Sequence, residues 1–200
     1  MKSALLEFYS NRKAFLDEID SQGIDKTLVY DRAFDFSPSP IMFIGEAPGD
    51  NEVKEGRPFC GMAGKNLTKL IESTGLDRNK ILITNAFAFR TFEPSKTGVK
   101  NRTPNNAELT LGAEMLLREI KIVKPKVIVV LGGSAEKAFL KLQDEGLKTG
   151  FKTLAKHEIK EIKKDFFLAK THHPSPLVFN RPDKRAELFE FFSRLDELAR

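Results

Sequence analysis

The stretch Ile41-Met42-Phe43-Ile44-Gly45-Glu46-Ala47-Pro48-Gly49 decides the fold of this chain. Its first four residues are apolar and predict a short buried strand, and the Gly- and Pro-containing residues after them predict a loop. A strand that runs directly into such a loop places backbone amides and the Glu46 carboxylate at the carboxyl edge of a sheet. Because open α/β folds bind their ligands at that edge, the stretch indicates an α/β fold with a ligand site at this loop.

Segments on both sides of this stretch alternate between strand and helix patterns. Val- and Ile-rich runs predict strands, and Leu and Phe at helical spacing predict helices. The alternation favours a three-layer α/β/α sandwich around a short, mostly parallel central sheet, and we expect a single domain over residues 1–200. The expected strands are 41–44, 80–84, 126–131 and 165–170, the expected helices are 3–20, 62–73, 106–120, 135–143 and 182–198, and the segments 35–40 and 87–104 are expected to be loops.

The composition is that of an ordinary globular protein. Of the 200 residues, 40% are hydrophobic and 30% are charged, and no apolar run approaches the roughly 20 residues that span a bilayer. Residues 1–20 mix Leu and Phe with Lys, Glu and Asp, which is unlike a signal peptide. We therefore expect a cytoplasmic monomer without a membrane segment. The net charge of +5 is compatible with nucleic-acid binding and does not by itself establish it.

Polar residues follow three of the expected strands at the point where each strand ends. Glu46 follows the first strand, Asn85 ends the second, and His172 and His173 follow the last. Each has an ordinary structural explanation, as a solvated carboxylate, a turn residue or a histidine that satisfies a loop backbone. In a parallel sheet, however, these strand ends share one edge, so the side chains are expected to converge on one pocket. Taken together, they favour a functional site.

Four motifs in this order resemble the uracil-DNA glycosylase superfamily, most closely its family 4. They are Gly-Glu-Ala-Pro-Gly-x-x-Glu at 45–52, Gly-x-Pro-Phe-x-Gly-x-Ala-Gly at 56–64, Ile-Thr-Asn at 83–85 and His-Pro-Ser at 173–175. The resemblance extends from about residue 41 to residue 191. It implies a monofunctional enzyme that flips uracil out of DNA, hydrolyses its N-glycosidic bond and leaves an abasic site.

The resemblance also implies roles for single residues. Asn85 would read the N3–H and O4 edge of uracil, and Phe59 would stack on the flipped base. His173 would donate to uracil O2 as negative charge develops there. Glu46 would position the attacking water, and Glu52 would lie near the C5 side of the base. Gly45 and Ala47 would complete the uracil site, and Ala47 stands where better-known uracil glycosylases carry Asp, which leaves water activation to Glu46.

Contacts to DNA are expected from two loops. The Gly-Gly-Ser turn before the fourth expected helix would bring Gly133 and Ser134 to a phosphate, although a tight connector explains the same residues nearly as well. The segment after His173 resembles a loop that enters the minor groove, where an apolar side chain replaces the flipped base. The candidates there are Ser175 and Arg181 for the backbone, and either Leu177 or Phe179 for the wedge.

The chain departs from family 4 in its cysteines. That family holds a four-iron cluster with four cysteines, but Cys60 is the only cysteine here, and the third and fourth cluster positions fall on Phe89 and near Gly112. One thiolate does not hold such a cluster, so we expect no cofactor and no metal, with Phe87, Phe89 and Phe92 packing in its place. Two alternatives stay open, namely a glycosylase of the same fold for hypoxanthine or xanthine, and a non-catalytic nucleic-acid-binding relative.

Overall fold

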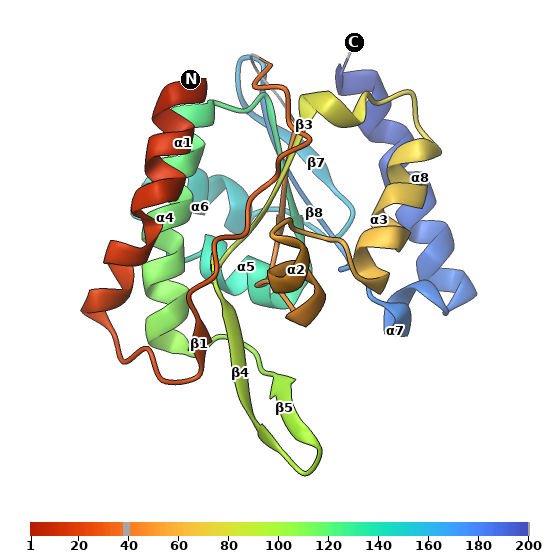
Figure 1. Cartoon of the computed structure of the whole chain (residues 1–200). Helices are drawn as coiled ribbons and strands as arrows, with labels where there is room; N and C mark the ends of the chain where they lie inside the picture. Colours follow the sequence, from red (N-terminus) through yellow and green to blue (C-terminus); the bar gives the residue numbers. More distant parts are fainter. Residues whose placement is uncertain (38–40, 200) are drawn as a thin grey trace.

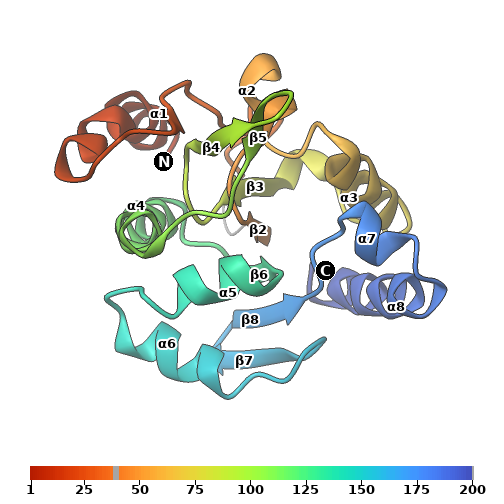
Figure 2. The same ribbon diagram turned by 90° about the horizontal axis from the view of Figure 1, so that it is seen from below.

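The computed structural model describes residues 1–37 and 41–199, so residues 38–40 of the predicted 35–40 loop lie outside it. Its centre is a five-stranded sheet in the order β3-β2-β6-β8-β7, seen along the strands in Figure 2. The first four strands run parallel, and β7 pairs antiparallel with β8 at the edge. The strands are β2 (Ile41–Gly45), β3 (Ile81–Asn85), β6 (Val127–Leu131), β7 (Ile159–Lys163) and β8 (Phe166–Thr171).

Helices cover both faces of this sheet (Figures 1 and 2). One face carries α1 (Lys2–Asn11), α4 (Asn106–Val123), α5 (Gly133–Phe139) and α6 (Glu145–Lys152), and the other carries α3 (Met62–Glu72), α7 (Pro176–Phe179) and α8 (Pro182–Ala199). The predicted three-layer α/β/α sandwich is therefore confirmed. The remaining described helices are η1 (Arg12–Glu18), α2 (Asp50–Glu55) and η2 (Arg78–Lys80).

Strand β2 shows why the sheet is buried on both faces. All five of its residues are buried, which is the pattern of a central parallel strand. Met42 and Ile44 join the hydrophobic cluster under α1 and α4, whereas Ile41 and Phe43 join the cluster under α3 and α8. This alternation follows from the two-residue period of a strand, which points successive side chains to opposite faces.

Several sequence predictions need correction. The helix expected over 3–20 is α1 followed by the 3₁₀-helix η1, and its Arg12 is buried in an ion pair with Glu119 at 3.0 Å. The loop expected over 87–104 is largely an antiparallel hairpin, in which β4 also pairs with β1. Gly98 makes its turn possible, because its φ of +123° strains any other residue. The strands of this small three-stranded sheet are β1 (Ile24–Asp25), β4 (Arg90–Ser95) and β5 (Gly98–Asn101).

The β4–β5 hairpin projects from the body of the protein beyond the carboxyl ends of the sheet strands (Figure 1). All four residues of β5 are exposed. The base of the hairpin is tied to the loop after β2, because Arg90 bonds both Asn101 and Asp50 at 2.8 Å. Among the described residues, no helix is long and apolar enough to span a bilayer.

Candidate active site

A small pocket lies where β2, β3 and β8 end. Its volume is about 130 Å³, and it is lined by the last residue of β3 and by residues of the loops and helices that follow β2 and β8. The parallel course of the three strands accounts for the convergence, because their carboxyl ends lie at the same edge of the sheet. The lining residues are Ala47, Glu52, Phe59, Ala63, Asn85 and His173.

Gly45 allows the wall of this pocket to form. It pairs in register with Asn85 across β2 and β3. A Cβ atom on Gly45 would lie 2.6 Å from two carbons of the Phe59 ring and 2.8 Å from Oδ1 of Asn85. Real Cβ atoms do not approach so closely, so the absence of a side chain brings the ring and the amide together. The Asn85 side chain is buried, with 9% exposure.

Phe59 is held by its backbone as well as by its ring. Its φ of +52° is in the left-handed region, which costs free energy in a residue with a side chain. At the start of α3, a Cβ atom on Gly64 would lie 1.6 Å from the Phe59 carbonyl oxygen. The Phe59 ring faces His173 across 5.7 Å between centroids, at 34° between planes. The two rings therefore form adjacent parts of the pocket wall.

Glu52 lines the pocket and also joins two loops. One of its carboxylate oxygens accepts from the Gly49 amide at 3.0 Å, and the other accepts from the amides of Cys60 and Gly61 at 3.1 and 2.8 Å. These bonds hold the loop after β2 against the loop that carries Phe59. Burial, and then the charge of Glu52, raise the pKa of the Cys60 thiol to about 11. Cys60 is therefore a protonated thiol at neutral pH and not a nucleophile.

His173 sits in a segment with three separate supports. A Cβ atom on Gly132, whose φ is +86°, would lie 2.7 Å from Cβ of His173, so the turn before α5 packs directly on it. The buried Asn66 amide donates to the Pro174 carbonyl at 2.9 Å. The amide of Gly132 donates to the carbonyl of Thr171 at 3.0 Å. Asn66 was missed by the sequence analysis, and its one signal was a polar residue on the apolar side of α3.

The charge state of His173 follows from its surroundings. Burial lowers the pKa of His173 below its ordinary value of 6.5, and the negative charges of Glu46 and Glu52 oppose that shift. The imidazole is therefore neutral at pH 7. Glu46 is half-buried, and its charge acts on the imidazole although it is not among the six lining residues. Its carbonyl accepts from the Phe87 amide at 3.0 Å, which ties the loops after β2 and β3 together.

The residues predicted to contact DNA separate into exposed and buried ones. Leu177 is 86% exposed on α7, whereas Phe179 is 7% exposed and packs in the core against Phe189. Phe179 is thus a core residue in this structure, which favours Leu177 of the two candidates for the wedge. Arg181 is exposed and paired with Asp183 at 3.1 Å. Gly133 is exposed, and Ser134 and Ser175 are half-buried at the first turns of α5 and α7.

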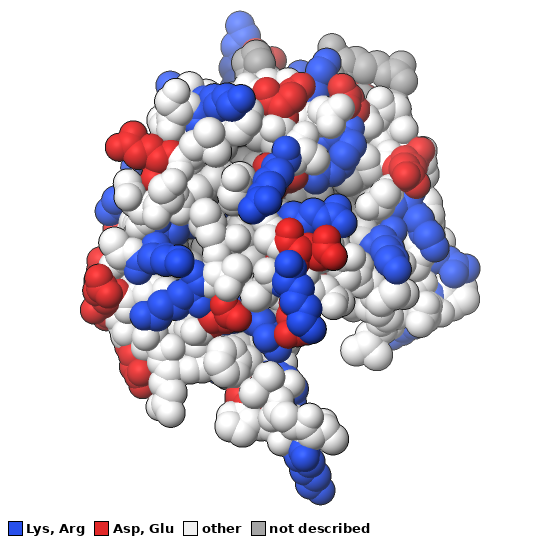
Figure 3. All heavy atoms as spheres, viewed as in Figure 1, with Lys and Arg blue, Asp and Glu red and all other residues white. Residues whose placement is uncertain are grey.

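The surface between the β4–β5 hairpin and the α7 region is hollowed in the space-filling view (Figures 1 and 3). Both flanks lie at the carboxyl end of the sheet, where the small pocket opens. Lys96 and Lys100 are exposed on the hairpin, and Leu177 is exposed on the opposite flank. This arrangement leaves room for an elongated ligand across the pocket.

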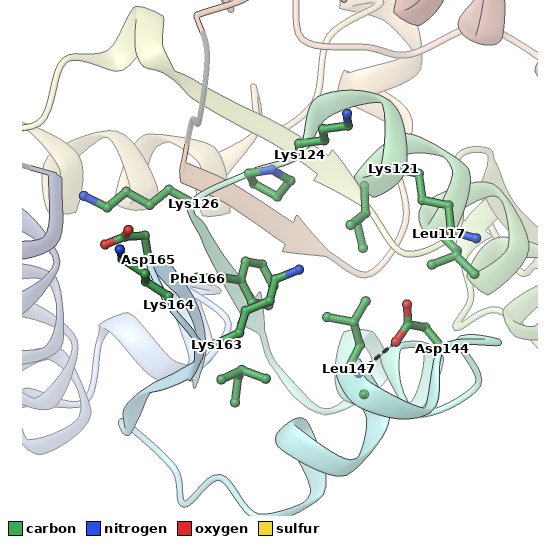
Figure 4. A pocket seen from close by; sticks show the side chains of 14 residues that line it. Leu117, Lys121, Lys124, Lys126, Asp144, Leu147, Lys163, Lys164, Asp165 and Phe166 are labelled. Carbon is green, nitrogen blue, oxygen red and sulfur yellow. Dashed lines mark hydrogen bonds between the residues drawn. The ribbon is translucent and has the colours of Figure 1, made fainter.

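A larger cavity of about 660 Å³ lies at the other end of the strands (Figure 4). The chain reaches it just before β6, at Lys126, and in the turn between β7 and β8, at Asp165. Leu117, Leu147 and Phe166 surround it. The strand ends that carry Asn85 and His173 are at the opposite edge of the sheet, so this cavity is separate from the candidate active site.

The iron–sulfur cluster of family 4 does not fit this chain. Cys60 is its single thiol, and the third cluster position is occupied by Phe89, whose side chain is fully buried. Near the fourth position, a Cβ atom on Gly112 would lie 2.3 Å from the Ala86 carbonyl oxygen. Helix α4 therefore packs tightly on the segment after β3, with Phe87 and Phe89 in edge-to-face contact at 5.8 Å.

Comparison with known proteins shows which family these motifs belong to. Residues 33–195 match the family model described as the uracil DNA glycosylase superfamily. A type-4 uracil-DNA glycosylase of Sulfurisphaera tokodaii is 39% identical over 166 residues, which cover 82% of this chain and 72% of that protein. Another, of Archaeoglobus fulgidus, is 34% identical over 159 residues, which cover 79% of this chain and 76% of that protein. A third, of Thermotoga maritima, is 36% identical over 146 residues, covering 72% and 69%.

Proposed function

This chain belongs to the uracil DNA glycosylase superfamily, and we propose that it hydrolyses the N-glycosidic bond of uracil in DNA and leaves an abasic site. The observation that carries the proposal is the pocket in which Asn85, Phe59 and His173 meet at one edge of the sheet. An amide, an aromatic face and a neutral imidazole are the groups that a flipped pyrimidine needs. We also propose that the chain acts as a single-domain monomer on DNA at the cytoplasmic nucleoid.

Asn85 and Phe59 bind the base. The Asn85 amide offers a donor for uracil O4 and an acceptor for N3–H, and its burial makes each unpaired polar contact costly. Cytosine presents an amino group at position 4 and a bare N3, so an amide in this orientation meets it donor to donor and acceptor to acceptor. The Phe59 ring supplies a face for stacking without competing hydrogen bonds. Gly45 keeps both groups close enough to act on one base.

His173 and Glu46 act on the reaction itself. As the glycosidic bond breaks, negative charge grows on uracil O2 and positive charge grows on the sugar. A neutral His173 donates its N–H to that oxygen, and removal of one such donor typically costs about 10²–10³ in rate. The Glu46 carboxylate orients the attacking water and favours the cationic sugar. No lysine is among the residues that line the pocket, which supports hydrolysis without Schiff-base strand cleavage.

DNA is held by the surface around the pocket. Leu177, with 86% of its surface exposed, is the proposed wedge that fills the space left by the flipped base. Lys96 and Lys100 on the hairpin and Arg181 beyond α7 are proposed phosphate contacts. Gly133, Ser134 and Ser175 would contribute backbone or hydroxyl contacts to the phosphates near the flipped nucleotide.

The test is base release from a labelled oligonucleotide with one uracil, opposite G, opposite A and single-stranded. Abasic sites are revealed by alkali, and a strand with hypoxanthine runs beside it. We expect uracil release, a loss of about 10²–10³ for His173→Ala, and loss of uracil recognition for Asn85→Asp, because the carboxylate lacks the donor to O4. Release of hypoxanthine alone would assign the enzyme to that lesion. Salt-dependent binding without any base release would leave a nucleic-acid-binding relative.

A further inference from the structure

Three side chains that the proposed reaction does not use converge behind the His173 segment. His157 precedes β7, His172 follows β8, and Glu187 lies on α8. Their donor atoms all lie within 4.8 Å of one another. Nε2 of His157 and Nε2 of His172 lie 3.0 and 3.2 Å from the same oxygen, Oε2 of Glu187. We infer that this cluster is a binding site for a divalent transition-metal ion of the zinc class.

The donor set suits such an ion. Two imidazoles and one carboxylate, with a remaining open position, are a common zinc ligand set, at about 2.0–2.2 Å from metal to donor. Tetrahedral geometry at those lengths separates neighbouring donors by about 3.3 Å, close to the 3.0 and 3.2 Å found here. The absence of a thiolate from the set does not disfavour zinc, because imidazole also suits zinc, copper and nickel.

His157 is oriented as a ligand would be. Its Nδ1 lies 2.8 Å from the hydroxyl of Thr171, a fully buried residue. A partner on one ring nitrogen directs the other toward a metal, as outer-shell groups do in known sites. Within the described residues, Nε2 of His157 is buried and has no hydrogen-bond partner, although Glu187 lies at 3.0 Å. A bound cation would satisfy this nitrogen, which otherwise lacks a well-aligned hydrogen bond.

Lys184 competes with a metal ion for the Glu187 carboxylate. Its ammonium lies 2.8 and 3.1 Å from the two oxygens of Glu187, so it supplies the positive charge in the absence of a metal. The side chain is 28% exposed, and its flexible stem allows the ammonium to turn to solvent when a metal binds. Removal of the Lys184 charge is therefore expected to tighten metal binding, whereas removal of a ligand abolishes it.

A metal bound here would have a structural role and would take no part in the reaction at the base. His172 is the residue before His173, so a metal between His157, His172 and Glu187 would join the end of β8 to α8 and to the chain before β7. The sequence analysis missed this set because His157 and His172 are 15 residues apart and Glu187 lies a further 15 away, a spacing unlike that of a short metal motif.

The test is titration of the purified full chain with Zn²⁺ alone and with Co²⁺ alone, without DNA, so that it is independent of glycosylase activity. We expect one equivalent to bind, with visible Co²⁺ absorption typical of nitrogen and oxygen ligands. Glu187→Gln and His157→Gln should weaken binding by more than about 10²-fold, and Thr171→Val by about 10–100-fold. Lys184→Gln should bind more tightly than the natural sequence.

Two variants serve as matched controls. Glu190→Gln changes an exposed carboxylate on the same helix, and His173→Gln removes the one histidine outside the set. Both are expected to bind one equivalent with unchanged affinity. Failure of the natural sequence to bind either ion would overturn the inference. Binding that survives both Glu187→Gln and His157→Gln would also overturn it, since the metal would then lie elsewhere.

Discussion

Replacing Gly45 by Ala tests the close packing on which the proposed uracil pocket depends. A Cβ atom there would lie 2.6 Å from Cε2 and Cζ of Phe59 and 2.8 Å from Oδ1 of Asn85. Carbon atoms in good contact are about 3.5–4.0 Å apart, so the ring or the strand has to move by about 1 Å. A misplacement of about 1 Å costs about 10²-fold in rate. An extra methyl group in a packed region also costs about 1–3 kcal/mol of stability.

The assay is single-turnover uracil release with enzyme in excess, together with unfolding in urea. Gly146→Ala is the matched control, because a Cβ atom on this α6 glycine meets Asp144 Oδ1 at an ordinary 3.4 Å. The control should keep its rate and gain up to about 1 kcal/mol from the higher helix propensity of Ala. A Gly45→Ala protein with the rate and the stability of the natural sequence would refute the packing argument.

Three further predictions concern other parts of the chain. Cys60 should react with iodoacetamide about 100-fold more slowly than an unperturbed thiol at pH 8, since burial and the Glu52 charge raise its pKa from 9.0 to about 11; alkylation at the free-thiol rate would contradict this. Arg12→Met should destabilise the fold by about 3–5 kcal/mol in urea unfolding, because it leaves the buried Glu119 carboxylate without its ion pair at 3.0 Å. An unchanged unfolding midpoint would count against that reasoning. Lys96→Gln combined with Lys100→Gln should weaken binding to undamaged DNA and flatten its salt dependence by about 0.9 in log–log slope per lost contact, and an equal slope would show that these two lysines do not contact phosphates.

The core of the fold was predictable because its signals are local. Apolar runs at β2 and β6 and the Gly/Pro-rich loop after β2 were enough for the parallel sheet and the edge that binds ligand. The hairpin over 90–101 was not predictable, because Pro94 and the charged residues of the segment interrupt the alternation of apolar and polar residues that marks a strand. Strand β7 was missed for a related reason, since Ile-Lys-Glu-Ile-Lys at 159–163 is a short edge strand interrupted by a bulge.

The residues of the candidate site were predictable from the sequence, but the contacts that position them were not. Parallel topology alone brings Asn85 and His173 to one edge. The choice between Leu177 and Phe179 depends on the helical phase of α7, which turns the first to solvent and the second into the core. The contact of Asn66 with the Pro174 carbonyl joins residues 108 positions apart, and no local pattern indicates such a pair.

The strand ends at the pocket are held by different interactions, and the ends of β2 and β3 show how hydrogen bonds and ion pairs fix the shape of the site. The loop after β2 is held by Glu52 through three backbone amides. The end of β3 is held from the α1 and α4 side of the sheet. There the Thr84 hydroxyl donates at 2.9 Å to the buried Glu119 carboxylate, which also pairs with Arg12. A buried charge pair is weak evidence for stability but strongly resists rearrangement, because separating its partners leaves an unpaired charge in the core. Asn85 follows Thr84 directly, so the position of the base-reading amide depends on a charge network on the α1 and α4 side of the sheet.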